Sequence, residues 1–225
     1  TARPENMFSF MKRAPKNAPL FVSQFVLDAE DPYDLVDEVA QFWGMYEHED
    51  FMRPEDLPDG VFDVSCALDY YGRILNGGHA QFLANSEFST STYDSIERVL
   101  RESGNDPMLA IFTKFRRAVG ASPSQDLFED TGMLEQLTEL DQALYALQKG
   151  AFDFYATTNK WIRNDLDVVV KSSEEVEQFR NSFASNLPGY RDYKLGAYLA
   201  PLMYGLREND TGLFQAAVSG MRVEK

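Results

Sequence analysis

Apolar residues recur at spacings of three and four along most of the chain, which is the spacing of one face of an α-helix. The clearest run lies in residues 131–148 and stops before Gly150; its apolar positions are Leu134, Leu137, Leu140, Leu144 and Leu147. The alternation typical of strands is weak, and residues 167–170 are the only short candidate. The pattern predicts an all-α protein.

Helix-start signals divide this periodic sequence into segments. Asp31-Pro32 and Asp106-Pro107 each place a capping side chain before a proline, and Ser172 with Glu175 forms a capping box. Together they predict a single domain, an irregular bundle of about eight or nine helices, over residues 28–225. We expect helices near residues 33–46, 63–75, 78–85, 92–101, 107–119, 131–148, 172–184, 191–206 and 210–221. Residues 1–27 are mildly basic and rich in proline, and are expected to form an irregular arm.

The chain is strongly acidic, with 36 acidic and 21 basic residues and a formal net charge of −15. Such a surface repels nucleic acid and anionic membranes and attracts basic proteins. No apolar run reaches the roughly 20 residues of a membrane-spanning helix. Cys66 is the only cysteine, which excludes an intramolecular disulfide and fits a reducing, cytoplasmic location. We therefore expect a basic protein partner, with no direct contact to nucleic acid or membrane.

The acidity is concentrated in one stretch of chain. Residues 28–69 hold fourteen acidic side chains and a single basic one, Arg53. Asp34, Asp37 and Glu38 are spaced to share one helix face, where like charges are destabilising. A rigid set of carboxylates could imitate a DNA duplex, which carries one charge per ~1.7 Å; a solvated face that only confers solubility is the other interpretation. The predicted partner-binding residues are Asp28, Glu30, Asp31, Asp34, Asp37, Glu38, Glu47, Glu49, Asp50, Glu55, Asp56 and Asp59.

Two further segments carry a likeness to a known family. One spans residues 68–86 and contains Asn76, Gly77, Gly78, His79, Gln81, Phe82, Leu83 and Asn85; the other spans residues 137–145, Leu-Thr-Glu-Leu-Asp-Gln-Ala-Leu-Tyr. Over about residues 30–165 the chain resembles the DNA-mimic protein family, long catalogued as a domain of unknown function. The resemblance implies an all-α fold, a homodimer, and an acidic surface that competes with DNA for a DNA-binding protein such as a transcription factor. His79 departs from the family, which usually has an aromatic residue there.

We interpret the Asn-Gly-Gly segment as structural. Gly77 and Gly78 permit backbone angles that other residues avoid, and Asn76 tolerates a left-handed helix end. Gln81 and Asn85 could satisfy the backbone groups freed by the break if they are buried. None of these residues is expected to be catalytic.

The sequence offers little catalytic or metal-binding chemistry. His48 and His79 are the only histidines, they are far apart, and no metal, nucleotide or nucleophile motif is present. We expect no metal, no cofactor and no enzymatic activity. Two alternatives stay open: an immunity- or antitoxin-like inhibitor of a basic nuclease or toxin, and an enzyme using a carboxylate pair such as Asp165 and Asp167 or Glu129 and Asp130. Five basic residues could pair with acids of neighbouring helices or meet the acidic patch of a second copy: Arg98, Arg101, Lys114, Arg116 and Arg117.

Overall fold

The structure, a computed structural model, describes residues 19–44, 54–85, 90–120 and 131–186. Within these ranges it contains eight α-helices and one small sheet of two strands, which confirms the all-α prediction. The helices predicted at residues 191–206 and 210–221 lie outside the described residues, as do Glu47, Glu49 and Asp50.

The elements follow one another with short connections. In chain order they are β1 (Leu20–Ser23), α1 (Gln24–Asp28), α2 (Pro32–Gly44), the 3-10 helix η1 (Pro54–Asp56), α3 (Val61–Asn85), α4 (Thr90–Glu102), α5 (Asp106–Val119), α6 (Thr131–Gln148), α7 (Phe154–Asp165), β2 (Val168–Lys171) and α8 (Ser173–Ser185).

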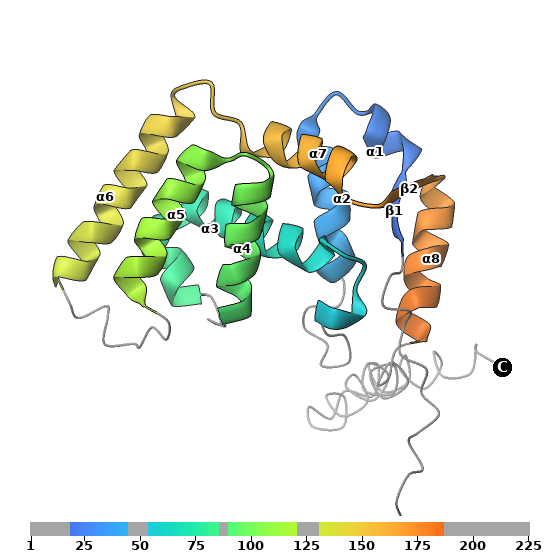
Figure 1. Cartoon of the computed structure of the whole chain (residues 1–225), viewed down its shortest axis with the longest axis horizontal. Helices are drawn as coiled ribbons and strands as arrows, with labels where there is room; N and C mark the ends of the chain where they lie inside the picture. Colours follow the sequence, from blue (N-terminus) through green and yellow to red (C-terminus); the bar gives the residue numbers. More distant parts are fainter. Residues whose placement is uncertain (1–18, 45–53, 86–89, 121–130, 187–225) are drawn as a thin grey trace, which may run out of the picture.

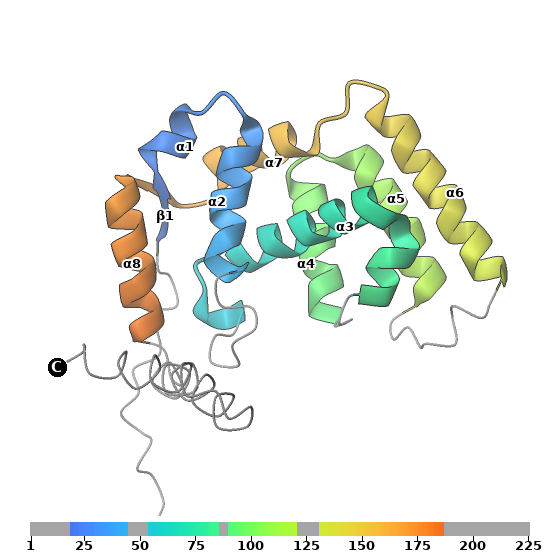
Figure 2. The ribbon, with the colours of Figure 1, turned by 180° about the vertical axis from the view of Figure 1, so that it is seen from behind.

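Helix α3 is the central element of the bundle. It packs against α2, α4 and α6, while α5 lies between α4 and α6 at one end of the molecule. Helix α7 packs against α2, and the sheet and α8 form the opposite end (Figures 1 and 2). One apolar core runs through the described residues, and its largest fully buried side chains include Tyr70, Phe82, Phe112 and Phe115. Their rings meet in edge-to-face and tilted contacts that fix the position of α3 against α5.

Two of the three predicted helix caps are present. The cap predicted at Asp106 is wrong, because α5 begins one residue earlier, with Asn105 at its N-cap and Asp106 in its first turn. Glu175 Oε2 accepts the Ser172 N–H at 2.9 Å, and Ser172 Oγ accepts the Glu175 N–H at 3.2 Å, which is the expected capping box of α8. Asp31 Oδ1 accepts the Tyr33 N–H at 2.9 Å at the start of α2. These local signals place both helix starts within a residue or two.

Two regions differ from the expectation. Helix α7 was not predicted, although Phe154, Thr158, Trp161 and Ile162 are buried at helical spacing. Its β-branched, aromatic and Asn residues are weak helix formers, so burial against α2 sustains it. Residues 20–27, predicted to belong to the irregular arm, form β1 and most of α1. The strand candidate at residues 167–170 is confirmed as β2, which pairs in parallel with β1.

Helix α3 breaks at the predicted Asn-Gly-Gly segment. Gly77 leaves the helical geometry, with φ −151° and ψ 18°, and Gly78 has φ +76° and ψ −177°, after which the helix resumes. A Cβ at Gly78 would lie 2.8 Å from Cγ of Asp141, and the left-handed φ would itself be strained. The break therefore needs glycine both for its backbone angles and for the close approach of α6.

We expect Gly78→Ala to lower the free energy of unfolding by roughly 2 kcal/mol or more, because it adds backbone strain and a steric overlap. Gly72→Ala is the matched control on the same helix: nothing lies within 4 Å of its added Cβ, and it should stabilise by about 0.5–1 kcal/mol. Urea unfolding followed by far-UV circular dichroism measures both. Equal effects of the two substitutions would contradict the assigned role of Gly78.

Candidate functional site

The predicted acidic residues divide by exposure and place. Asp28, Glu30, Asp31 and Asp59 are exposed, whereas Asp34, Asp37, Glu38 and Asp56 are half-buried. The side chain of Glu55 lies outside the described residues. Six of these eight described residues lie on α2 or in the segment before it, whereas Asp56 ends η1 and Asp59 lies between η1 and α3.

Two acids of this set, Asp37 on α2 and Asp28 at the end of α1, accept hydrogen bonds from neutral side chains. Asp37 accepts the Tyr33 hydroxyl at 2.9 Å and the Gln41 side-chain amide at 2.5 Å. Asp28 accepts the amide of Gln24 at 2.8 Å. Among the described residues, no Lys or Arg forms an ion pair with Asp28, Glu30, Asp31, Asp34 or Asp37. These donors fix carboxylate positions without cancelling their charge.

Two tyrosines lie among these carboxylates. Tyr33 on α2 and Tyr155 on α7 meet edge-to-face with ring centroids 5.2 Å apart. The hydrogen bond to Asp37, with burial and the nearby charge of Asp34, raises the pKa of Tyr33 to about 12. Burial and the charges of Tyr71, Asp31, Asp153 and Asp37 raise the pKa of Tyr155. We call the surface formed by Asp31, Tyr33, Asp34, Asp37, Asp153 and Tyr155 the α2–α7 surface.

Sequence reasoning missed Asp153, Tyr33 and Tyr155 as members of this surface. Asp153 is the N-cap of α7, and its Oδ1 accepts the Ala156 N–H at 2.9 Å. Because α7 itself was not predicted, nothing placed Asp153 beside α2. The Asp-x-x-Ala start followed by apolar residues at helical spacing was the available signal.

Glu38 has a structural role that the sequence did not suggest. Its carboxylate accepts the Ser23 N–H at 2.6 Å and the Ser23 hydroxyl at 2.7 Å, and its carbonyl accepts Arg180 Nη2 at 2.6 Å. The expectation that Glu38 would present its charge together with Asp34 and Asp37 therefore needs correction, because its side chain turns to β1 rather than outward beside theirs.

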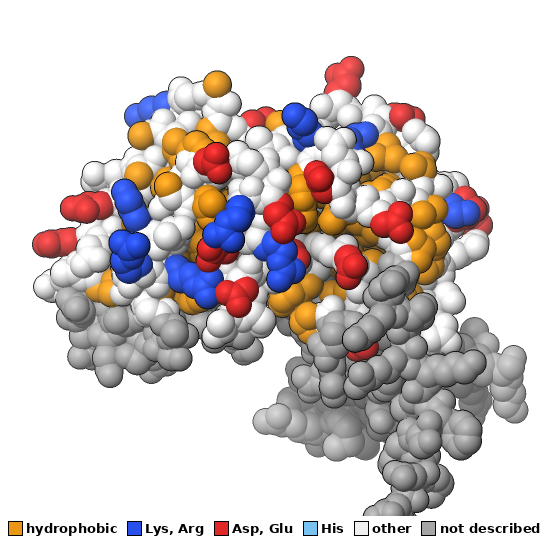
Figure 3. Space-filling view, in the orientation of Figure 1, with side chains coloured by type: hydrophobic (Ala, Val, Ile, Leu, Met, Phe, Trp, Pro, Cys, Tyr) orange, Lys and Arg blue, Asp and Glu red, His pale blue; other side chains and the backbone are white. Residues whose placement is uncertain are grey.

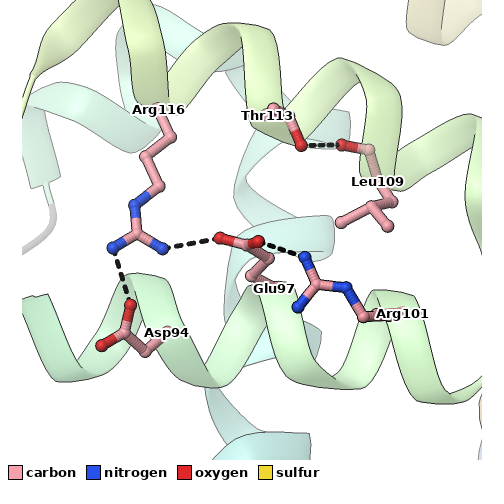
Figure 4. A network of polar contacts seen from close by, with 6 residues as sticks. All are labelled: Asp94, Glu97, Arg101, Leu109, Thr113 and Arg116. Carbon is pink, nitrogen blue, oxygen red and sulfur yellow. Dashed lines mark hydrogen bonds and ion pairs between the residues drawn. The ribbon is translucent and has the colours of Figure 1, made fainter.

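Three of the five basic residues singled out on α4 and α5, Arg98, Arg101 and Arg116, pair with acids, which is one of the two arrangements expected. Arg98 Nη1 lies 2.6 Å from Asp63 Oδ2 of α3. Arg116 of α5 binds Asp94 at 2.6 Å and Glu97 at 2.7 Å, and Arg101 also pairs with Glu97. Figure 4 shows Arg116 of α5 bound to Asp94 and Glu97 of α4, and the pair of Arg101 with Glu97 within α4. In Figure 3, Lys and Arg side chains gather over α4 and α5 with acids between them.

The two segments that carry the family likeness meet inside the molecule. His79 is fully buried after the break in α3; its N–H donates to Asp141 Oδ1 at 2.9 Å, and its Nδ1 lies 2.5 Å from the same oxygen. Its Nε2 lies 3.0 Å from the Tyr70 hydroxyl. The arrangement fits Nδ1–H as donor to Asp141 and Nε2 as acceptor from Tyr70. Asp141 thus connects α6 to the break.

The polar residues of the motif differ from their expected roles. Asn85 is exposed, and its carbonyl accepts Arg73 Nη1 at 3.2 Å. Gln81 folds over Gly77, and its Oε1 has no hydrogen-bond partner among the described residues. Asp141, not Gln81 or Asn85, satisfies the His79 N–H freed by the break.

The described residues offer no metal site and no membrane-spanning helix. No group of three or more His, Cys, Asp or Glu side chains there is arranged to hold a metal ion. Cys66 is buried. Within the same part of the chain, no helix has the length and apolar character needed to cross a membrane.

Comparison with known proteins gives one match. Residues 55–165 match the model of the family described as DMP19-like protein. This supports membership of that family, which is the DNA-mimic family that the sequence resembles. No curated protein and no solved structure matches the chain significantly. The matched region runs from η1 through α7 and contains both the Gly78 break and Asp141, but not the acids of α2.

The buried histidine predicts a pH dependence of stability. Burial lowers the pKa of His79 despite the opposing hydrogen bond and charge of Asp141. Unfolding returns the imidazole to a pKa of about 6.5, so below that pH the unfolded chain binds more protons than the folded one. Stability should therefore fall as pH drops from about 6.5 toward the lower folded pKa.

Urea unfolding of the parent chain and of His79→Phe between pH 5 and 7.5 tests this prediction. The variant carries at this position the aromatic side chain that is usual in the family. The substitution should remove part of the pH slope even though it lowers stability overall, because Tyr70 and Asp141 lose their partner. Identical slopes in both proteins would show that His79 does not titrate on unfolding.

Proposed function

We propose that this protein is an acidic DNA mimic that binds a DNA-binding protein and competes with DNA for it. The observation that carries the proposal is the contrast between two sets of acids. Asp63, Asp94 and Glu97 are paired with arginines, whereas among the described residues Asp31, Asp34 and Asp37 form no ion pair with Lys or Arg. Asp31 and Asp37 accept hydrogen bonds from neutral donors instead. The family match supports the same function.

The geometry of the α2–α7 surface suits a basic partner. Asp34 and Asp37 are three residues apart on a helix, and this spacing corresponds to ~4.5 Å along the axis. Hydrogen bonds to Tyr33 and Gln41 hold Asp37, so little side-chain freedom is lost when a cation binds. Tyr33 and Tyr155 add rings on which an arginine side chain can stack. A DNA-binding surface supplies such arginines for phosphate contact.

The two alternatives have less support. An inhibitor of a basic nuclease would use the same surface, so it differs only in the identity of the partner. For an enzyme with a carboxylate pair, a pocket lined by two converging acids would be needed. Neither of two described pockets has one: the first is lined by Thr90, Tyr93, Arg116, Arg117 and Gly120, and the second has Asp153 as its single acid.

The proposal can be tested by displacement from DNA. Cytosolic extract from the source organism is bound to duplex DNA on a column at low salt, and the purified chain is used to elute it. A released DNA-binding protein is then purified, and the chain is titrated against its complex with fluorescent duplex, followed by anisotropy. We expect displacement at low salt that weakens as salt rises, because exposed charges are screened.

A triple variant locates the surface. Asp31→Asn, Asp34→Asn and Asp37→Asn together should weaken competition by about tenfold or more, while Asn at position 31 preserves the helix cap. The control removes the same charge elsewhere: Glu135→Gln and Glu139→Gln on α6 with Glu174→Gln on α8, all exposed. Equal losses in both variants would contradict a role for the α2–α7 surface, and release of a nuclease would favour the inhibitor.

A further inference from the structure

Within the described part of the chain, the small sheet has one edge covered by helices and one edge open. Helices α1, α2 and α8 all pack against β1, and the Ser23 N–H at its outer edge donates to Glu38. Among the described elements, none other than β1 packs against β2 to a comparable extent. Val170 of β2 is 44% exposed. In Figure 3, hydrophobic side chains reach the surface beside α8, where Figure 1 places the strands.

The register shows which backbone groups of β2 point away from β1. Leu20 is paired with Val168, and its N–H donates to Asp167 O at 3.2 Å. In a parallel pair with this bond, the N–H and carbonyl of Val169 face β1. The N–H and carbonyl groups of Val168 and Val170 face away from β1. The Val168 N–H donates instead to Leu166 O at 2.9 Å, which agrees with this assignment. The Val168 carbonyl and the Val170 N–H and carbonyl therefore lie along the open edge.

The sequence of this edge is complementary to itself. It runs Asp167-Val168-Val169-Val170-Lys171, with an acid at one end and a base at the other. An antiparallel copy centred on Val169 places Val168 opposite Val170, the two residues whose backbone groups point outward. The same register places each Asp167 opposite a Lys171, so opposite charges meet at both ends.

We propose that β2 pairs antiparallel with β2 of a second copy of this chain, making a four-stranded sheet across a two-fold axis at Val169. The Val170 N–H of each copy donates to the Val168 carbonyl of the other, and Asp167 of each copy lies beside Lys171 of the other. A two-fold axis lets one strand satisfy both sides of the interface. Two strands alone form a marginal sheet, which two further strands stabilise.

Existing contacts of Lys171 are compatible with this pairing. Its Nζ lies 3.2 Å from Glu175 at an exposed position and 5.9 Å from the centre of the Phe21 ring. A neighbouring carboxylate from the second copy adds a partner without removing one. The interface is separate from the α2–α7 surface, so its test does not depend on DNA mimicry.

Val170→Pro tests the pairing in the full chain. Proline removes an N–H that faces away from β1, a position where an edge strand tolerates it. The variant should keep its circular dichroism spectrum, while the dimer dissociation constant measured by sedimentation equilibrium rises about tenfold or more from the loss of two hydrogen bonds. Val170→Thr keeps the N–H and should dimerise as the parent does. A monomeric parent, or an unchanged constant in Val170→Pro, would overturn the proposal.

A charge swap tests the register independently of proline. Asp167→Lys alone and Lys171→Asp alone each place like charges at both ends of the paired strands and should be mainly monomeric. Mixing the two variants should restore a dimer containing one copy of each, because every end then meets an opposite charge. If the mixture stays monomeric, or if each variant dimerises as the parent does, the proposed register is wrong. Dimerisation that appears only after deletion of residues 1–18 would also overturn it, because the edge would be covered in the whole chain.

Discussion

The arrangement of the helices depends on the contact between the Asp141 carboxylate and His79. The carboxylate accepts the backbone N–H of His79 at the break in α3, lies close to the ring nitrogen of the same residue, and comes from α6. Gly78 leaves room for this approach, since a Cβ there would overlap the carboxylate. A buried N–H without a partner is costly, so the break and the docking of α6 stabilise each other. The family match spans these residues, and their contact accounts physically for why two segments far apart in sequence carry the likeness.

Much of the fold could be predicted because its signals are local. The capping box at Ser172, the cap at Asp31 and the Asn-Gly-Gly sequence that marks the break are each recognisable from residues within a few positions of one another. Helix α7 and strand β1 were missed because their stability comes from contacts with distant elements: α7 packs on α2, and β1 pairs with β2 nearly 150 positions later. Short elements with weak propensity carry little signal of their own.

The candidate surface was predicted only in part, because some of its residues are brought together by contacts between distant elements. Charge density along the sequence located the acids near α2, and spacing placed Asp34 and Asp37 close together. Spacing could not show that the Glu38 carboxylate binds Ser23. It also could not show that Asp153 and Tyr155, far along the chain, lie beside α2. Whether a carboxylate is neutralised depends on which cations fold next to it, and here Arg98, Arg101 and Arg116 of α4 and α5 pair with other acids. Within the described part of the chain, Asp34 and Asp37 of α2 form no ion pair with a Lys or Arg.

The central claim is that those charges stand in for a nucleic-acid backbone, and the salt dependence of binding tests it most directly. The affinity of the released DNA-binding protein would be measured for duplex DNA and for this chain across the same series of salt concentrations. We predict that both affinities fall as salt rises, because both ligands neutralise the same cationic side chains. Binding of this chain that does not change with salt, while DNA binding weakens, would contradict mimicry.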